Sequence, residues 1–314
     1  MCDEFASDRI NDIDDDGLRA WPLPMPSEDG DKEQRGSVLV IAGSRQMPGA
    51  AILAATAALR AGAGKLTIAT SAATAPLVAL AMPEARVVDL PETDAGAIAP
   101  AAADILNGML AKFDTVLIGP GMQDEQGSCA FVMALLPHLN GAKLVLDAAA
   151  MNVVRRQLQA VDATCHPQQR YVSQFDTPVL LTPHAGEMAH LNACDKHGVL
   201  ADPLAAARHA ARRWNALVAL KGATTIIAAP SGEVWRHEGG NIGLAISGSG
   251  DALSGIIAGL SARGAQLEQA AAWGVALHAR AGERLAERFG PLGYLAREIP
   301  AEIPALMHAL CLQP

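Results

Sequence analysis

The stretch SVLVIAGSRQMPGA, residues 37–50, sets a pattern that most of the chain repeats. Residues 38–42 are all apolar and show no alternation with polar residues, which predicts a strand buried on both faces. Gly43 and Gly49 then bound a short loop, and the alanine-rich residues 50–61 predict a helix. A strand, a turn and a helix in this order form one βα unit of a parallel sheet.

The same alternation of apolar strands and helices continues along the chain. Further strands are predicted at residues 65–70, 86–90, 115–118, 143–146, 178–182 and 216–220. Helices are predicted near residues 101–111, 127–136 and 203–214, and from residue 251 onward. A hairpin is predicted for residues 225–229 and 233–237. Together these elements predict an α/β fold, with a mostly parallel central sheet and helices on both faces.

The organisation into domains follows from where this pattern begins. No break in composition interrupts it, so residues 36–314 are expected to form a single domain. Residues 1–35 combine four aspartates between positions 12 and 16 with prolines at positions 22, 24 and 26, a composition that resists regular structure. We expect residues 1–35 to form an irregular arm that lies on the domain or on a neighbouring molecule. We also expect a surface excursion at residues 162–177.

Charge and cysteine content exclude several classes of protein. The 24 basic and 33 acidic residues give a net charge of −9, and no cluster of lysine or arginine offsets it, which argues against a nucleic-acid partner. The five cysteines are scattered, without paired or metal-site spacing, at positions 2, 129, 165, 194 and 311. The acidic N-terminus and the lack of a long apolar run argue against a signal peptide and a membrane span, so we expect a soluble cytoplasmic protein.

The stretch SGSGD, residues 247–251, is typical of a helix start that binds an anion. It places a carboxylate at the start of a helix behind two glycines. Backbone N–H groups at such a start approach an anion without side chains in the way, and the first helical turn adds a partial positive charge. Gly248, Ser249 and Gly250 are therefore a candidate anion loop, and Asp251 is either a helix cap or a base beside a phosphate.

Other candidate residues also stand where a predicted strand stops. The carboxyl ends of parallel strands share one edge of the sheet, and ligands of such folds bind there. We therefore expect one site to gather Ser44, Gly121, Asp147, Asn152, His184, Glu187, Lys221 and Asp251.

The turn TPHAGE, residues 182–187, has a structural and a functional interpretation. Thr182 could cap the following helix and Glu187 could favour its N-terminus, with His184 merely exposed. Alternatively, His184 donates a hydrogen bond to a polar substrate. No second histidine stands at the spacing that a metal site on a helix needs.

Three further polar residues also have two interpretations each. Lys221 could pair with a nucleotide phosphate or, equally well, with the C-terminal end of a neighbouring helix. Asp147 could cap a helix, or it could hold Mg²⁺ through a water molecule. Asn241 suits a plain turn as well as the lining of the site. His237 and His278 are assigned to structural or solvated positions.

Taken in order, these motifs resemble the ADP/ATP-dependent NAD(P)H-hydrate dehydratase family across residues 36–290. The resemblance rests on residues 43–50, on GPG at 119–121, on Asp147 with Asn152, on residues 182–187, on Lys221 with Gly222, and on Asn241 with residues 248–251. It implies a ribokinase-like fold. It also implies repair of the hydrated nicotinamide nucleotides NADHX and NADPHX, with ADP or ATP as co-substrate and with Mg²⁺.

The resemblance also implies roles for individual residues. The substrate would lie against Ala50, Gly121, His184 and Asp251. The adenine nucleotide would be held by Lys221, Gly222, Ala223, Thr224, Thr225 and Gly250. Asp251 would act as the catalytic base toward the substrate hydroxyl. Supporting roles would fall to Asp147, Asn152, Glu187 and Asn241.

Three positions depart from the family pattern. Ala149 stands where an aspartate is usual, Ala185 where a proline is usual, and Ser249 where a threonine is usual. Two alternatives stay open, because kinases of this fold share the anion loop and because the departure at Ala149 removes a carboxylate. One is a small-molecule kinase of the same fold, of the hydroxymethylpyrimidine or hydroxyethylthiazole type; the other is a relative that binds nucleotide without turnover. The alanine-rich helices and the N-terminal arm lead us to expect a homo-oligomer.

Overall fold

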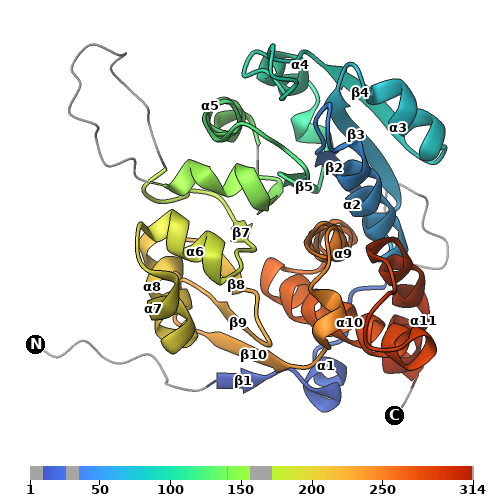
Figure 1. Cartoon of the computed structure of the whole chain (residues 1–314), viewed down its shortest axis with the longest axis vertical. Helices are drawn as coiled ribbons and strands as arrows, with labels where there is room; N and C mark the ends of the chain where they lie inside the picture. Colours follow the sequence, from blue (N-terminus) through green and yellow to red (C-terminus); the bar gives the residue numbers. More distant parts are fainter. Residues whose placement is uncertain (1–9, 26–34, 140, 156–171, 313–314) are drawn as a thin grey trace, which may run out of the picture.

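The computed structural model describes residues 10–25, 35–139, 141–155 and 172–312. One ten-stranded sheet runs through it in the order β1-β10-β9-β8-β7-β6-β5-β2-β3-β4 (Figure 1). The strands are β1 (Ile10–Asp12), β2 (Ser37–Ile41), β3 (Lys65–Ser71), β4 (Arg86–Leu90), β5 (Thr115–Ile118), β6 (Lys143–Leu146), β7 (Val179–Leu181), β8 (Leu217–Leu220), β9 (Thr224–Ala228) and β10 (Val234–Glu238). Neighbouring strands are parallel except where β9 meets β8 and β10.

Helices connect most of these strands. The α-helices are α1 (Asp15–Ala20), α2 (Pro48–Arg60), α3 (Ala75–Ala81), α4 (Ala102–Asn107), α5 (Glu125–Leu135), α6 (Ala185–Asn192), α7 (Lys196–Ala201), α8 (Pro203–Trp214), α9 (Ser249–Ala262), α10 (Leu267–Phe289) and α11 (Ile299–Leu312). Short 3-10 turns are η1 (Leu110–Lys112), η2 (Leu136–His138), η3 (Ala148–Val154), η4 (Ile242–Leu244) and η5 (Ala296–Glu298). In the described part of the chain, no helix has both the length and the apolar composition to cross a bilayer.

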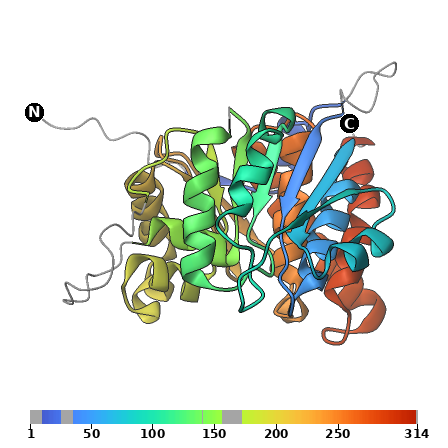
Figure 2. The ribbon, with the colours of Figure 1, turned by 90° about the horizontal axis from the view of Figure 1, so that it is seen from above.

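Two hydrophobic cores lie on opposite faces of the sheet. Because side chains alternate along a strand, Val38 and Val40 of β2 point into one core, and Leu39 and Ile41 point into the other. The first core packs against α2, α9, α10 and α11, and the second against α4, α5, α6 and α8. Figure 2 shows the strands between these two sets of helices. The predicted α/β architecture, mostly parallel with helices on both faces, is therefore confirmed.

The local predictions differ from the structure mainly at element ends. The predicted strands at 86–90, 115–118 and 143–146 and the predicted hairpin are confirmed. The helix predicted near residues 101–111 instead ends at Asn107, and η1 follows it. Gly108 lies between the two, and glycine is a poor helix former.

Residues 10–25 of the N-terminal arm lie on the domain, which was one of the two expected positions, but they contain a strand and a helix where irregular structure was predicted. β1 pairs with β10, and Ile13, Leu18 and Leu23 are buried in the first core. An aspartate contributes to this order: the Asp14 carboxylate caps α1 by accepting a hydrogen bond from the Gly17 N–H. Residues 1–9 and 26–34 lie outside the described residues, as does most of the surface excursion predicted at 162–177.

The contact between α2 and α9 is unusually close because two glycines of α9 face the α2 backbone. A Cβ added at Gly255 would lie 2.2 Å from the Ala54 carbonyl oxygen, and one added at Gly259 would lie 2.3 Å from that of Ala58. α9 is buried along nearly its whole length and lies in the middle of the molecule in Figure 1. This contact fixes where the N-terminus of α9, with its SGSGD stretch, meets the sheet.

We therefore predict that Gly259→Ala lowers the free energy of unfolding by about 2 kcal/mol, because the new methyl group forces α2 and α9 apart. The matched control is Gly198→Ala in α7, where an added Cβ meets nothing within 4 Å. The free energy of unfolding of that control should rise by up to about 1 kcal/mol, because alanine has a higher helix propensity than glycine. Urea unfolding followed by circular dichroism measures both, and equal effects of the two substitutions would contradict the close contact.

Candidate functional site

The ends of β6, β7 and β8 bring three polar side chains together. Asp147 follows β6 and is 3% exposed. Its Oδ1 atom accepts a hydrogen bond from the Thr182 hydroxyl, which follows β7, at 2.8 Å. Lys221, which follows β8, places its Nζ atom 3.3 Å from the same Oδ1 atom. The three strands are neighbours in the sheet, so the predicted convergence of these ends is present in the fold.

Lys221 lies among acidic groups. Besides Asp147, its Nζ atom lies 3.8 Å from the Glu187 Oε2 atom. Burial alone would lower the pKa of Lys221, but the charges of Asp147 and Glu187, with a smaller contribution from Asp251, raise it above its ordinary value. Lys221 therefore stays positively charged, contacts the carboxylates of Asp147 and Glu187, and interacts electrostatically with that of Asp251.

Asp251 is the third of these carboxylates, and it does not cap its helix. The N-cap of α9 is Gly248, and Asp251 lies in the first turn without a side-chain capping bond. Burial, and after it the negative charge of Asp147, raise the pKa of Asp251 to about 6, against an opposing effect of Lys221. A carboxylate with a pKa near neutrality is suited to act as a general base. The structure thus favours the functional interpretation of Asp251.

The candidate anion loop has free backbone donors. Gly248 has φ 89°, a left-handed conformation that glycine adopts without strain. The Ser249 N–H donates to the Ile246 carbonyl and the Ala252 N–H to that of Gly248. Within the described residues, the N–H groups of Gly250 and Asp251 meet no acceptor. They are oriented as the unpaired donors of a helix start, which is the geometry that binds anions. An added Cβ at Gly250 would lie 3.4 Å from Lys221 Nζ, so the loop lies against that cation.

The turn after β7 combines a capping box with a free donor. His184, and not Thr182, is the N-cap of α6: its Nδ1 atom accepts from the N–H groups of Gly186 and Glu187. The Glu187 carboxylate accepts from the His184 N–H at 2.8 Å. Because Nδ1 accepts these bonds, the ring proton lies on Nε2. The exposed Nε2–H of His184 is thus available to a ligand, and the structural and functional interpretations hold together.

Ala50 and Gly121 form a second edge of the candidate site. An added Cβ at Gly121 would lie 2.5 Å from the Ala50 Cβ, so the two candidate substrate residues are in contact. One turn along α2, Leu53 lies against Gly248, where an added Cβ would be 2.6 Å from its Cδ1 atom. The start of α2 therefore borders the anion loop.

The remaining candidates lie in different surroundings. Gly222 and Ala223 are exposed in the turn between β8 and β9, directly beside Lys221. Thr224 and Thr225 begin β9. The Thr225 hydroxyl donates to the Gly222 carbonyl at 3.4 Å. This turn is accessible to a nucleotide next to the charged cluster.

Two other candidates, Asn241 and Asn152, have structural contacts, and a third, Ser44, has a buried hydroxyl without one in the described part of the chain. Asn241 caps η4, and its Oδ1 atom accepts from the Gly243 N–H and from the Tyr294 hydroxyl, which supports the plain-turn interpretation. Asn152 lies in η3 and donates to the Ala149 carbonyl at 3.1 Å. Ser44 is fully buried, with no partner for its hydroxyl among the described residues.

His278 contacts the anion loop, although the sequence analysis set it aside. Its Nε2 atom lies 3.0 Å from the Ser249 Oγ atom and 3.1 Å from the Ser249 carbonyl oxygen. No local motif marks this residue, because its contact is made between α10 and the start of α9. Sequence reasoning would have needed the packing of these two helices to find it.

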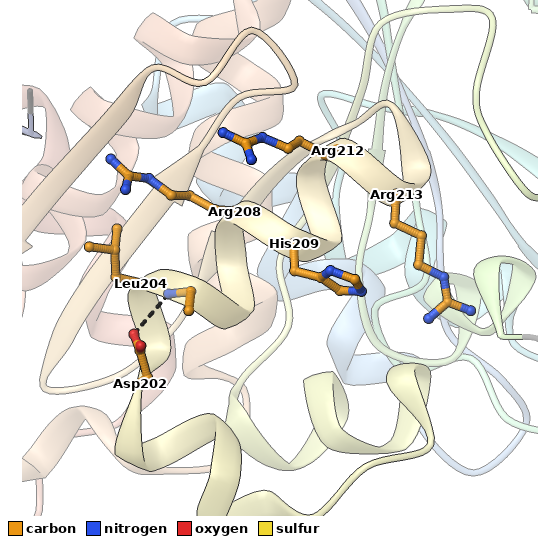
Figure 3. A pocket seen from close by; sticks show the side chains of 7 residues that line it. Asp202, Leu204, Arg208, His209, Arg212 and Arg213 are labelled. Carbon is orange, nitrogen blue, oxygen red and sulfur yellow. Dashed lines mark hydrogen bonds between the residues drawn. The ribbon is translucent and has the colours of Figure 1, made fainter. Parts of the chain in front are cut away.

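A separate hollow of about 600 Å³ lies along α8, and none of its lining residues belongs to the cluster around Lys221. Arg208, His209, Arg212 and Arg213 line it from successive turns of α8 (Figure 3). Within the described residues, no group of three or more His, Cys, Asp or Glu side chains could hold a metal ion.

Comparisons with known proteins bear directly on this geometry. The family model described as NAD(P)H-hydrate dehydratase matches residues 38–305. The chain belongs to the NAD(P)H-hydrate dehydratase family. It is 45% identical over 302 residues to the ADP-dependent (S)-NAD(P)H-hydrate dehydratase of Xanthomonas campestris pv. campestris, with 96% of this chain and 98% of that protein covered.

Solved structures of NAD(P)H-hydrate dehydratases and their relatives share the fold. The Bacillus subtilis ADP/ATP-dependent NAD(P)H-hydrate dehydratase, co-crystallized with ATP/Mg²⁺, matches with a TM-score of 0.78 at 27% identity, over 97% of this chain and 100% of that one. A ribokinase-like superfamily protein from Enterococcus faecalis V583 matches with a TM-score of 0.80 at 24% identity, over 99% and 100%. The predicted family and the ribokinase-like fold are confirmed. The chain also matches bifunctional NAD(P)H-hydrate repair enzymes, of which it spans about half the length.

The cluster around Lys221 predicts how Asp251 titrates. Asp147→Asn removes a negative charge that raises the pKa of Asp251, so that pKa should fall below 6. A carbon-detected NMR titration of the aspartate carboxyl groups measures it. Asp195→Asn, at the exposed N-cap of α7, is the matched control and should leave Asp251 unchanged. A pKa of Asp251 that stays the same in Asp147→Asn would show that the two carboxylates do not interact.

Proposed function

We propose that this chain is an ADP-dependent (S)-NAD(P)H-hydrate dehydratase, a lyase that restores NADH and NADPH from NADHX and NADPHX. The observation that supports this most directly is the position of Asp251, which combines a pKa of about 6 with a place beside free N–H donors of the anion loop. The relative from Xanthomonas campestris carries this activity in its name and aligns over nearly its full length.

The reaction begins with phosphoryl transfer to the hydroxyl of the hydrate. Asp251 accepts the hydroxyl proton as the oxygen attacks the terminal phosphorus of ADP, and AMP leaves. The free N–H groups of Gly250 and Asp251 stabilise the negative charge on the transferring phosphoryl group. The phosphorylated hydrate then loses inorganic phosphate and one proton from the adjacent carbon, which restores the double bond of the dihydropyridine.

Two sets of residues would position the reactants. The hydrate would lie against Ala50, Gly121 and His184, with the exposed Nε2–H of His184 donating to one of its polar groups. The nucleotide would lie over the turn from Lys221 to Thr225, where the lysine carries the positive charge nearest to the loop. Mg²⁺ would arrive with the nucleotide, because the described residues offer no metal-binding cluster of their own. The bound Mg²⁺ would neutralise part of the negative charge on the phosphate groups.

The test of this proposal is an assay with NADHX, Mg²⁺ and either ADP or ATP, in which NADH absorbance and released phosphate are followed together. We expect NADH and phosphate in equal amounts, and a higher rate with ADP. A stable phosphorylated product with a pyrimidine or thiazole alcohol, and none with NADHX, would instead establish the kinase. Tight ADP binding without turnover of any substrate would establish the binding-only alternative.

Asp251→Asn should abolish turnover and leave ADP binding nearly unchanged, because the amide cannot accept the hydroxyl proton. It should also raise the stability at pH 8. The pKa of Asp251 is raised in the folded state, so its stabilising effect is present at low pH and lost as the pH rises through 6. Removing the charge should raise the free energy of unfolding at pH 8 by on the order of 1 kcal/mol. Calorimetry measures ADP binding and unfolding, and an active variant would exclude Asp251 as the base.

Lys221→Ala should weaken ADP binding about tenfold, since the cation nearest to the anion loop is lost. It should also move the acidic limb of the pH–rate profile to higher pH, because Lys221 lowers the pKa of Asp251. Lys196→Ala, on the exposed surface of α7, is the matched control and should change neither property. An unshifted acidic limb in Lys221→Ala would contradict the coupling between the two groups.

We also propose that the protein works in a reducing compartment, the cytoplasm, and as a homo-oligomer. Among the described residues, Cys129, Cys194 and Cys311 are free, as a reducing compartment requires. Sedimentation analysis of the purified protein tests the oligomer.

A further inference from the structure

His278 lies on the face of α10 that packs against the start of α9. Gly274, His278 and Gly282 are spaced four residues apart and therefore share one side of the helix. An added Cβ at Gly274 would lie 2.5 Å from the Ile257 Cγ1 atom of α9, and one at Gly282 would lie 2.6 Å from the Leu244 Cγ atom of η4. The chain on both sides of Ser249 is thus held close to α10, which leaves the imidazole little freedom.

The proton on this imidazole can be placed from its partners. Burial lowers the pKa of His278 to about 4, partly opposed by the bond to the Ser249 carbonyl, and the charge of Lys221 lowers it as well. The ring is therefore neutral at physiological pH and carries one N–H. A carbonyl oxygen only accepts hydrogen bonds, so the 3.1 Å contact with the Ser249 carbonyl is a hydrogen bond when the proton lies on Nε2, and we assign this tautomer to the ring.

The same N–H also determines how the Ser249 hydroxyl is oriented. Its Oγ atom lies 3.0 Å from Nε2, which carries the proton, so Oγ accepts and its own hydrogen points away from the ring. Serine has no second heavy atom beyond Oγ on its Cβ to restrict χ1, so this contact supplies the restraint on the hydroxyl. The anion loop then presents a hydroxyl donor in addition to the free N–H groups of Gly250 and Asp251.

We propose that His278 is a positioning residue, which holds the Ser249 hydroxyl so that it donates to the phosphoryl group transferred at the anion loop. The inference rests on the proposed function, and it adds a residue to the machinery of that reaction. His278 touches neither substrate in this account and acts only through Ser249. Replacing His278 should therefore lower the reaction rate only in a protein that still has the Ser249 hydroxyl.

The first test needs no turnover, so it separates this inference from the proposed function. In protein labelled with ¹⁵N-histidine, long-range ¹H–¹⁵N correlation spectra distinguish the two neutral tautomers and the charged ring. We expect His278 to be the Nε2–H tautomer from pH 6 to pH 8. An Nδ1–H tautomer or a charged ring in this range would overturn the inference, whatever the assay with NADHX shows.

The second test is a double-mutant cycle on kcat/KM for the hydrate. Ser249→Ala should lower kcat/KM about 10- to 100-fold, as expected for the loss of one donor to the transition state. His278→Phe should lower it less, mainly through kcat, and His278→Gln, which keeps a donor, should recover most of the loss. The double variant Ser249→Ala/His278→Phe should be no worse than Ser249→Ala alone. Losses that multiply would overturn the inference.

His237 provides a matched control for this cycle. It is also a buried histidine with a backbone carbonyl partner, since its Nδ1 atom lies 3.0 Å from the Ile13 carbonyl oxygen, but it does not contact Ser249. The effects of His237→Phe and Ser249→Ala should multiply, because the two sites are independent. If His278→Phe does not fold, the tautomer of the wild-type ring and the His278→Gln variant still decide the question.

Discussion

The close contact between α2 and α9 is the constraint on which the rest of the site depends. Two helices approach this closely only where one of them has no side chains at the contact, and Gly255 and Gly259 supply that face of α9. The contact sets the height of the α9 N-terminus above the sheet. Gly248, Gly250 and Asp251 then meet the ends of β6, β7 and β8, and Ala50 at the start of α2 lies alongside.

Charge balance at these strand ends distinguishes the two aspartates, Asp147 and Asp251. Asp147 is fixed by Thr182 and by Lys221, so its charge is compensated. Asp251 is buried close to that charge but lacks a bonded cation of its own, and its pKa rises to about 6. Lys221 thus forms an ion pair with Asp147, and its charge also opposes the rise in the pKa of Asp251. A carboxylate with a pKa near neutrality is suited to act as a general base.

Sequence reasoning predicted the order of strands and helices and the convergence of their ends, because apolar strands and glycine turns are local signals. It also left the right alternatives open at Asp251 and His184. It was wrong about the irregular structure of residues 10–25, since one of the aspartates taken as breakers caps α1. The pairing of β1 with β10, far along the chain, is a contact that no local pattern shows. His278 was missed for the same reason: its role comes from α10 packing on α9, which no local pattern encodes.

In the proposed function, the strand-end cluster and the anion loop form one site, with Asp251 at the reacting hydroxyl. A crystal structure of Asp251→Asn with NADHX and ADP tests it directly, because the variant should bind both without consuming them. We expect the hydroxyl of the hydrate within about 3 Å of the substituted side chain at position 251, and the terminal phosphate of ADP against the N–H groups of residues 250 and 251. A hydrate bound elsewhere, with its hydroxyl away from residue 251, would contradict it.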